Sequence, residues 1–234
     1  LSPRPGVCTV QPMVQGVDST RARPLPRGPH RLTREEVERS QRDRLLMAAA
    51  DAVAERGYVA TSVEDILRRA GVSRTTFYQL FDSKSDCFLA ACSMAAEVVA
   101  TVMANELAHL EGDHAATPAE RLDRLLTAYL QTLVDHPALA RVFLVEVYAA
   151  GTAAIQQRRA SLDQFVDLLV ATQHGPGGLL GAAPDPRFAA EVFVGAVSSM
   201  VTNLVGVGEI DRIVELREPL MDLATQLIAV GEPT

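Results

Sequence analysis

Apolar residues recur at intervals of three and four along most of the chain, which is the spacing of one helix face. The pattern is clearest in two short segments between Thr61 and Lys84. Their apolar faces are formed by Val63, Ile66, Leu67 and Ala70 in the first segment and by Phe77, Leu80 and Phe81 in the second. Gly71 between them suits the left-handed conformation that ends a helix, and Ser73 is a typical N-cap. A short helix, a turn that contains Gly and a second helix make the helix-turn-helix pattern.

The first short helix has two candidate caps. Thr61 and Glu64 match the Thr-x-x-Glu capping box, in which each residue satisfies a backbone N–H of the other. Ser62 can cap in place of Thr61.

The second short helix leaves polar residues outside its apolar face. Arg can form two hydrogen bonds with guanine, Gln can do so with adenine, and Thr can hydrogen-bond a base or touch the thymine methyl group. The first turn of such a helix is where base edges are read. The candidate DNA-binding residues of this region are Thr61, Ser62, Ser73, Arg74, Thr75, Thr76, Tyr78, Gln79 and Lys84. Spacing alone leaves an alternative open, namely an amphipathic helix pair inside a bundle.

The remaining apolar pattern, with its caps and breaks, predicts seven more helices and an all-α fold. They cover approximately residues 33–56, 83–110, 117–135, 137–150, 152–173, 185–207 and 209–230. Capping boxes at Thr33–Glu36 and Thr117–Glu120 fix two of the starts. Of the nine helices, we assign three to a DNA-binding domain at 33–82, one to a connector, and five to the body of a second domain at 83–234.

Residues 1–32 form the third predicted part of the chain, a tail. Six prolines in this stretch argue for disorder. Arginines near its end are Arg21, Arg23, Arg27 and Arg31. We favour a solvated linker, and an arm that follows DNA phosphates is the alternative.

The charge of the chain is unevenly distributed. Residues 1–90 hold 14 Lys and Arg against 11 Asp and Glu, whereas residues 91–234 hold 8 against 18, and the whole chain carries −7. Positive charge is therefore concentrated around the helix-turn-helix, and the acidic remainder would be repelled by phosphate.

The stretch from Arg42 to Phe88 resembles the DNA-binding domain of TetR-type transcriptional regulators. The matching residues are Leu45, Ala48, Ala49, Ala52, Gly57, Tyr58, Thr61, Ser62, Val63, Asp65, Ile66, Ala70, Gly71, Val72, Ser73, Thr76, Phe77, Tyr78, Phe81, Ser83, Lys84 and Phe88. The chain departs from the pattern at Thr75, where a small residue is expected, and at Gln79, where an aromatic is common. We expect both changes to alter which operator is read.

The resemblance implies a homodimer and a small-molecule effector. Two-fold pairing of the last two helices fits it, because small residues there allow close helix approach. The candidate interface residues are Gly195, Ala196, Ser199 and Leu220.

Effector contacts can be suggested only from physical arguments. Glu146 shares a predicted helix face with Leu139 and Phe143, so it either pairs with a base or lines a cavity. Arg141 falls on the opposite side of that helix. The ligand candidates are Tyr129, Phe143 and Glu146, although Tyr129 also fits a core position.

The cysteines, Cys8, Cys87 and Cys92, indicate free thiols in a reducing cytoplasm. Cys87 and Cys92 lie five positions apart on one predicted helix and point about 140° from each other, so they should not pair. Redox sensing by Cys87 is a minor alternative.

Several other functions lack support in the sequence. No uncharged apolar run reaches the length of a membrane helix, and the nearest, 192–207, contains Ser, Thr and Asn. The 174–184 loop lacks a phosphate-binding pattern. His109, Glu111, Asp113 and His114 fit a solvated turn better than a metal site. We expect no cofactor, no membrane association and no enzymatic activity, because no catalytic constellation stands out.

The sequence therefore predicts a cytoplasmic homodimeric DNA-binding regulator that responds to a small molecule, most simply a repressor of a palindromic operator. An activator of the same fold, an enzyme that uses the second domain and a helical protein-binding module are the alternatives. Neither the effector nor the operator can be named from the sequence.

Overall fold

A computed structural model describes residues 33–111, 116–171 and 185–229. Within these ranges the chain forms nine α-helices and two short 3₁₀ helices, which confirms the predicted all-α fold. The predicted tail, the loop at 174–184 and two members of the rejected metal cluster, Asp113 and His114, lie outside the described residues.

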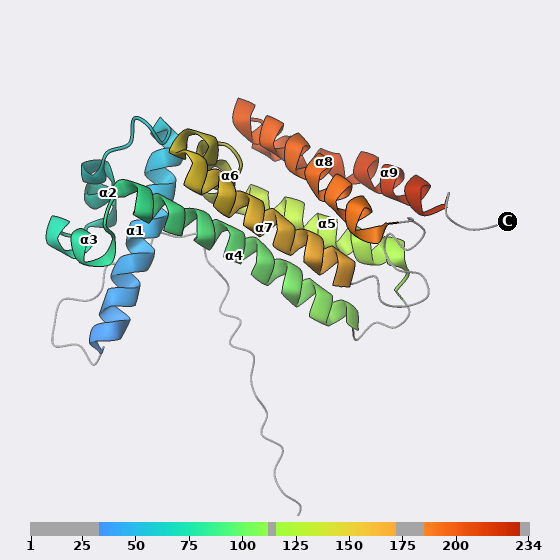
Figure 1. The fold of residues 1–234 in the computed structure, drawn as a ribbon, viewed down its shortest axis with the longest axis horizontal. Helices are drawn as coiled ribbons and strands as arrows, with labels where there is room; N and C mark the ends of the chain where they lie inside the picture. The colour runs from blue at the N-terminus through green and yellow to red at the C-terminus, as the bar shows by residue number, and fades with distance from the viewer. Residues whose placement is uncertain (1–32, 112–115, 172–184, 230–234) are drawn as a thin grey trace, which may run out of the picture.

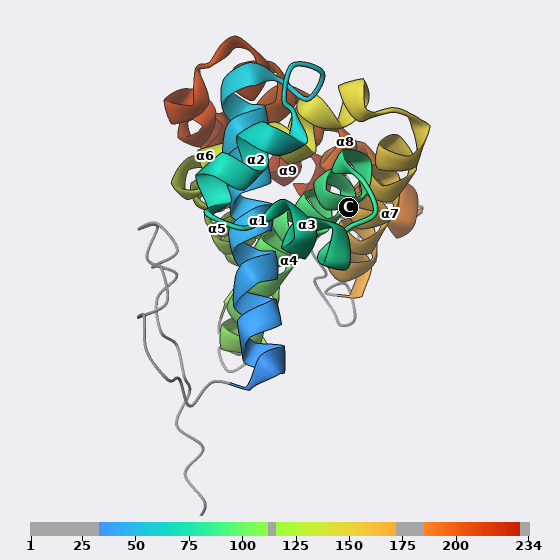
Figure 2. The same ribbon diagram turned by 90° about the vertical axis from the view of Figure 1, so that its left-hand side faces the viewer.

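The first three helices gather at one end of the molecule, as Figures 1 and 2 show. They are α1 (Arg34–Arg56), α2 (Val63–Ala70) and α3 (Arg74–Leu80). Thr33 and Glu36 form the predicted capping box of α1. Gly71 ends α2 with a left-handed φ of 64°, a conformation that side chains with a Cβ rarely adopt.

The other helices form the body, to the right in Figure 1. They are α4 (Lys84–Glu111), α5 (Pro118–Asp135), α6 (Pro137–Leu144), α7 (Thr152–Ala171), α8 (Pro186–Val207) and α9 (Arg217–Ala229). The 3₁₀ helix η1 (Glu146–Ala150) follows α6, and η2 (Ile210–Leu216) precedes α9. Thr117 with Glu120 caps α5 as predicted, and the Asp185 side chain caps α8.

Two predicted helices are thus each divided in the structure. The helix expected to run from Pro137 to Ala150 ends at Leu144, and the helix expected at 209–230 begins as η2. In a continuous helix Arg141 and Glu146 would point about 140° apart. The break brings their side chains together, with Arg141 Nη2 3.3 Å from Glu146 Oε1.

The buried apolar side chains form two clusters that share α1 and α4. One cluster lies among α1, α2, α3 and the first turns of α4 and includes Leu45, Ile66, Phe77, Phe81 and Cys87. The other fills the body but includes Ala50 and Val53 of α1 and Phe88 of α4. Adjacent faces of α1 and α4 therefore serve both halves of the molecule.

Two helices within the described ranges, α4 over Lys84–Leu110 and α8, are long and apolar enough to cross a membrane by length and composition alone. Core helices of soluble proteins pass the same test. Here α4 packs against α1, α5, α6 and α7, which accounts for its apolar character.

Candidate nucleic-acid interface and apolar cavity

The recognition helix α3 is held in place by its aromatic face. The Phe77 side chain is fully buried and its ring packs against Phe81, with 5.7 Å between the ring centroids. The Arg42 guanidinium of α1 lies 4.7 Å from the centroid of Phe81. These contacts fix how α3 lies relative to α1.

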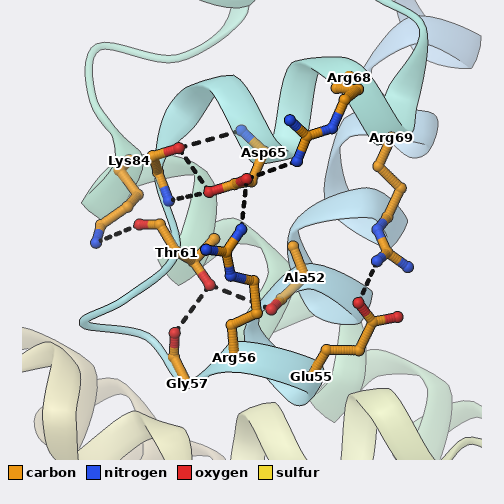
Figure 3. Close-up of polar contacts among 10 residues, drawn as sticks. Ala52, Glu55, Arg56, Gly57, Thr61, Asp65, Arg68, Arg69 and Lys84 are labelled. Atoms are coloured by element: carbon orange, nitrogen blue, oxygen red, sulfur yellow. Dashed lines mark hydrogen bonds and ion pairs between the residues drawn. The ribbon is translucent and has the colours of Figure 1, made fainter.

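Asp65 joins α2 to the end of α1, as Figure 3 shows. Its Oδ1 accepts from Arg56 at 2.6 Å and from Arg68 at 2.7 Å, and its Oδ2 accepts from the Ser62 hydroxyl at 2.6 Å. A second link, from Arg69 to Glu55, also joins the two helices. The hydrogen bonds from Ser62, with smaller contributions from Arg68 and Arg56, hold the pKa of Asp65 well below its usual range.

The capping box of α2 differs from one of the two predicted arrangements. Ser62 is the N-cap and Asp65 closes the box, so Thr61 and Glu64 do not form it. The Thr61 hydroxyl instead donates to the carbonyl oxygens of Ala52 and Gly57, and its side chain is buried. Thr61 is therefore a structural residue, and its prediction as a DNA contact was wrong.

Lys84 was also predicted to contact DNA, but its ammonium group forms contacts within the chain. Its Nζ donates to the carbonyl oxygens of Tyr58 and Thr61 at 2.8 and 2.9 Å, and it lies 4.3 Å from the centroid of the Tyr58 ring. These contacts hold the loop between α1 and α2 against the start of α4. A free phosphate contact by Lys84 conflicts with this placement.

The remaining predicted residues fall into two groups. The side chains of Ser62, Ser73 and Thr76 are engaged in caps, since Ser73 Oγ accepts from Thr76 N at 3.1 Å and lies 2.8 Å from Thr76 Oγ1. An exposed surface on α3 is formed by Arg74, Thr75, Tyr78 and Gln79. Among the described residues, its polar contact is a long ion pair of Arg74 with Glu64, at 3.5 Å between two exposed side chains. Such a pair contributes little to stability and leaves Arg74 available to a ligand.

The body contains a partly open apolar cavity. Helices α4, α5, α7 and α8 supply its walls, and nearly all the lining residues are Leu, Val, Phe or Met. The two polar side chains on the lining are Tyr129 and Ser198. A concave, mostly apolar lining with a few polar groups is typical of small-molecule sites.

A cation lies directly behind the polar part of the lining. The Nη2 atom of Arg158 donates to Ser198 Oγ at 2.6 Å, and its Nε donates to the Phe143 carbonyl oxygen at 3.2 Å. Burial raises the pKa of Tyr129 above its usual range, and the positive charge of Arg158 partly opposes that rise. Sequence reasoning missed Arg158, because nothing in the local pattern sets it apart from Arg159.

Two of the three predicted ligand residues do not line this cavity. Glu146 is buried at the junction with the DNA-binding end, where Oε2 accepts from the Tyr58 backbone N–H at 2.8 Å and Oε1 pairs with Arg141. Phe143 is buried, and its carbonyl oxygen is bound by Arg158. Tyr129 alone lies on the cavity wall. For Glu146 the structure thus has the pair with a base, one of the two alternatives that its position allowed.

The predicted dimer residues are divided between surface and core. Gly195 and Ser199 are exposed on α8, and Ala196 is half-buried. Exposed apolar side chains on the same helix include Phe188, Val192 and Val207. Leu220 is buried within its own chain, where α9 packs on α5, so its assignment to a surface was wrong.

The thiols of Cys87 and Cys92 are free and buried, as predicted. Burial raises the pKa of both to about 12, which leaves them almost wholly protonated at neutral pH. Redox sensing by Cys87 conflicts with this environment. In the part of the chain that the structure describes, no three His, Cys, Asp or Glu side chains gather as metal ligands.

A family model described as bacterial regulatory proteins of the tetR family matches residues 45–91. This range covers the helix-turn-helix and the start of α4. Residues 45–91 therefore match the DNA-binding domain of TetR-family regulators.

Among named relatives, the chain is 43% identical over 61 residues to the HTH-type transcriptional activator FasR of Mycolicibacterium smegmatis. That match covers 26% of this chain and 26% of FasR, so the chain spans about a quarter of that relative. It is 24% identical over 165 residues to the Fatty acid metabolism regulator protein of Bacillus subtilis, which covers 69% of this chain and 81% of that protein.

The TetR fold extends through the body as well. The structure of the transcriptional regulator FadR from Bacillus subtilis in complex with stearoyl-CoA matches with a TM-score of 0.65 and 22% identity, over 78% of this chain and 96% of FadR. At this identity the likeness shows a shared fold. The named relatives are transcriptional regulators, which agrees with the sequence-based expectation of a regulator over an enzyme.

Proposed function

We propose that this TetR-family chain is a ligand-responsive transcriptional regulator of the bacterial cytoplasm that binds a palindromic operator as a homodimer. The observation that carries the proposal is the exposed surface of α3, formed by Arg74, Thr75, Tyr78 and Gln79. The apolar face of the same helix is buried against α1 and α4, so these side chains are presented from a fixed position.

The chemistry of this surface fits base reading. Arg74 can form two hydrogen bonds with guanine, Gln79 can do so with adenine, and Thr75 offers a hydroxyl and a methyl group. In a two-fold dimer, two such helices would enter successive major grooves about 34–36 Å apart. The exposed apolar residues of α8 support the pairing of two chains.

The cavity supports an apolar effector. Its lining of aliphatic and aromatic side chains suits a long hydrocarbon chain better than a polar metabolite. FadR, which shares the fold, is described in complex with stearoyl-CoA. The Bacillus subtilis relative is named a fatty acid metabolism regulator, and FasR is named a transcriptional activator. We therefore propose a long-chain acyl compound as the effector class.

Release from DNA would follow if the ligand favours one arrangement of the two DNA-binding ends over another. A ligand shifts such an equilibrium only by the difference in its affinity for the two states. The cavity is walled by α4, which also contributes to the core beneath α3, so filling it can change how α4 lies. Whether release represses or activates a gene depends on the position of the operator.

The proposal is tested by selection from a library of palindromic duplexes, with a random duplex as control, at two salt concentrations. We expect one palindrome to be enriched and its affinity to fall as salt rises. Weak binding without sequence preference would contradict the proposal.

Arg74→Ala tests the reading surface, with Arg159→Ala on α7 as a control that removes the same charge elsewhere. Arg74→Ala should cost about 1–3 kcal/mol of affinity for the selected operator and relax its specificity, because a bidentate base contact is lost. Random-duplex binding should change much less. Equal losses on both duplexes would assign Arg74 to phosphate contact.

A further inference from the structure

Arg158 is a half-buried cation of the body, and its partners are neutral. They are the Phe143 carbonyl oxygen and the Ser198 hydroxyl, together with the faces of two aromatic rings. Its guanidinium carbon lies 5.7 Å from the ring centroid of Phe143 and 5.4 Å from that of Tyr148. Among the described residues, no carboxylate forms an ion pair with Arg158.

Other arginines of the body differ in this respect. Arg141 pairs with Glu146, Arg187 with Asp167, and Arg217 with Asp123. Arg158 is also half-buried, and withdrawing a charge from water without a counter-charge is costly. The site therefore favours an anion that the chain itself does not supply.

The hydroxyl groups beside Arg158 are placed to donate to the same anion. Ser198 Oγ already accepts from Arg158, so its own O–H is free to donate. The Tyr129 hydroxyl stays protonated, because burial raises its pKa. Both residues line the cavity, whose remaining walls are apolar.

We infer that the cavity binds a long-chain fatty acid as the free carboxylate, with Arg158, Ser198 and Tyr129 holding the carboxylate and the apolar walls holding the hydrocarbon chain. This inference rests on the proposed effector cavity and narrows its ligand to one head group. A carboxylate accepts hydrogen bonds only, which matches three donors, and its single charge matches a single guanidinium.

A coenzyme A thioester suits this head-group site less well. Its carbonyl carries no charge, so Arg158 would stay without a counter-ion, and its phosphates would need further cations. The polar side chains on the cavity lining, Tyr129 and Ser198, supply none. A fatty alcohol has the same hydrocarbon chain and also leaves Arg158 unpaired.

The test compares three probes, stearate, stearyl alcohol and stearoyl-CoA, by calorimetry or displacement of a fluorescent fatty acid from the full chain. The wild-type chain should bind stearate more tightly than either of the others. Arg158→Met keeps the apolar stem but removes the charge. It should weaken stearate binding by about tenfold or more, since hydrogen bonds to charged groups are the strong ones, and should leave stearyl alcohol binding unchanged.

Arg159→Met is the matched control, because Arg159 is the next residue of α7 and is exposed. It should leave all three affinities unchanged. If Arg158→Met does not fold, Ser198→Ala keeps the cation and should weaken stearate binding by a few-fold without affecting the alcohol.

Three results would overturn the inference. Equal loss of stearate and alcohol in Arg158→Met would mean that Arg158 only supports the cavity wall. If the wild-type chain binds stearoyl-CoA more tightly than stearate, and Arg158→Met does not change that affinity, the head group of the ligand binds away from Arg158. If no probe binds the wild-type chain, the proposed acyl effector is also wrong. Operator selection uses no lipid, so it tests the proposed DNA-binding function separately.

Discussion

Asp65 shows how much of the DNA-binding end depends on one small side chain. Its two oxygens accept from Arg56, Arg68 and Ser62, so it caps α2 and ties α2 to the last turn of α1. The hydrogen bonds from Ser62, first among these, lower its pKa in the folded chain. A carboxyl group with a lowered folded pKa stabilises the fold above its unfolded pKa, and this stabilisation is lost as the pH falls toward the folded pKa.

Asp65→Asn should therefore destabilise the chain at pH 7, because the ion pairs and part of the cap are lost. The difference from the wild-type chain should shrink as the pH is lowered below about 4, the usual pKa of an unfolded Asp. Urea unfolding at pH 7, 5 and 3.5 measures this. Asp211→Asn, at an exposed residue, is the control. A difference independent of pH would show that the charge of Asp65 does not matter.

At the level of single residues, the sequence was informative where a local pattern decides. The caps at Thr33, Ser73 and Thr117 follow from residues three positions apart. Thr61 and Lys84 could not be assigned in this way, since their partners are backbone carbonyls from other parts of the fold. Arg158 is a stronger case, because its unpaired charge becomes visible only when its neighbours in space are known.

Among the elements, the junction of α6, η1 and α8 with the loop after α1 is the most direct polar link between the two ends. Glu146 accepts from the Tyr58 N–H and pairs with Arg141, whose Nη1 donates to the Val205 carbonyl oxygen at 3.3 Å. The link therefore reaches from the DNA-binding end to the last turns of α8. A change in α8 on ligand binding can be passed to Tyr58 through these contacts.

Glu146→Gln should reduce the effect of the ligand on operator binding more than it weakens ligand binding or operator binding itself. The amide keeps the shape of the side chain, but it no longer neutralises Arg141. We expect operator affinity without ligand to stay within a few-fold, and the ratio of operator affinities without and with effector to fall toward one. Fluorescence anisotropy with and without the bound acyl compound measures that ratio.

Glu218→Gln, at an exposed acidic residue of α9, is the control for this variant. An unchanged ratio together with lower thermal stability would limit Glu146 to packing. A loss of operator affinity in the absence of ligand would show that the link holds the DNA-binding end in its working position.

The helices themselves were largely predictable, because 3.6-residue spacing and caps are local signals. Their interruptions were not. The break after Leu144 brings Glu146 to Tyr58, 88 positions earlier in the chain, and no local pattern encodes such a contact. The 3₁₀ segment at Ile210–Leu216 was likewise predicted as α-helix.

Across the whole molecule, α8 presents an apolar surface that a single chain leaves uncovered. Phe188 and Val192 are 63% and 53% exposed, and Gly195 and Ser199 continue the same face. Small residues at its centre allow a second helix to approach closely. This surface, without the buried Leu220, is our revised candidate for the dimer interface.

Val192→Arg should convert the proposed dimer to a monomer, because it places like charges opposite each other across a two-fold interface. Light scattering after gel filtration gives the mass, and operator affinity should fall by about tenfold or more because each half-site then binds alone. Val59→Arg, at another exposed valine near the DNA-binding end, should leave the mass unchanged. A Val192→Arg chain that stays dimeric would exclude this face.

Family membership and the uneven charge were evident from the sequence, because they depend on motif spacing and composition. The cavity was not. Its walls come from four helices that span residues 99 to 198, and each lining residue reads locally as an ordinary core position. Only the packing of these helices distinguishes a space from a filled core.

The sharing of α1 and α4 between two clusters has a practical consequence for hybrid regulators. Consider a hybrid that joins the DNA-binding end of another regulator to this body after residue 82. The α1 of the other regulator would then pack against Phe88 and Cys92 of this α4, and its recognition helices would pack on Cys87 and Ala91 in place of their own partners. The boundary between the two clusters runs lengthwise between adjacent faces of the same helices. A working chimera would therefore have to graft helix faces, residue by residue, in addition to joining segments end to end.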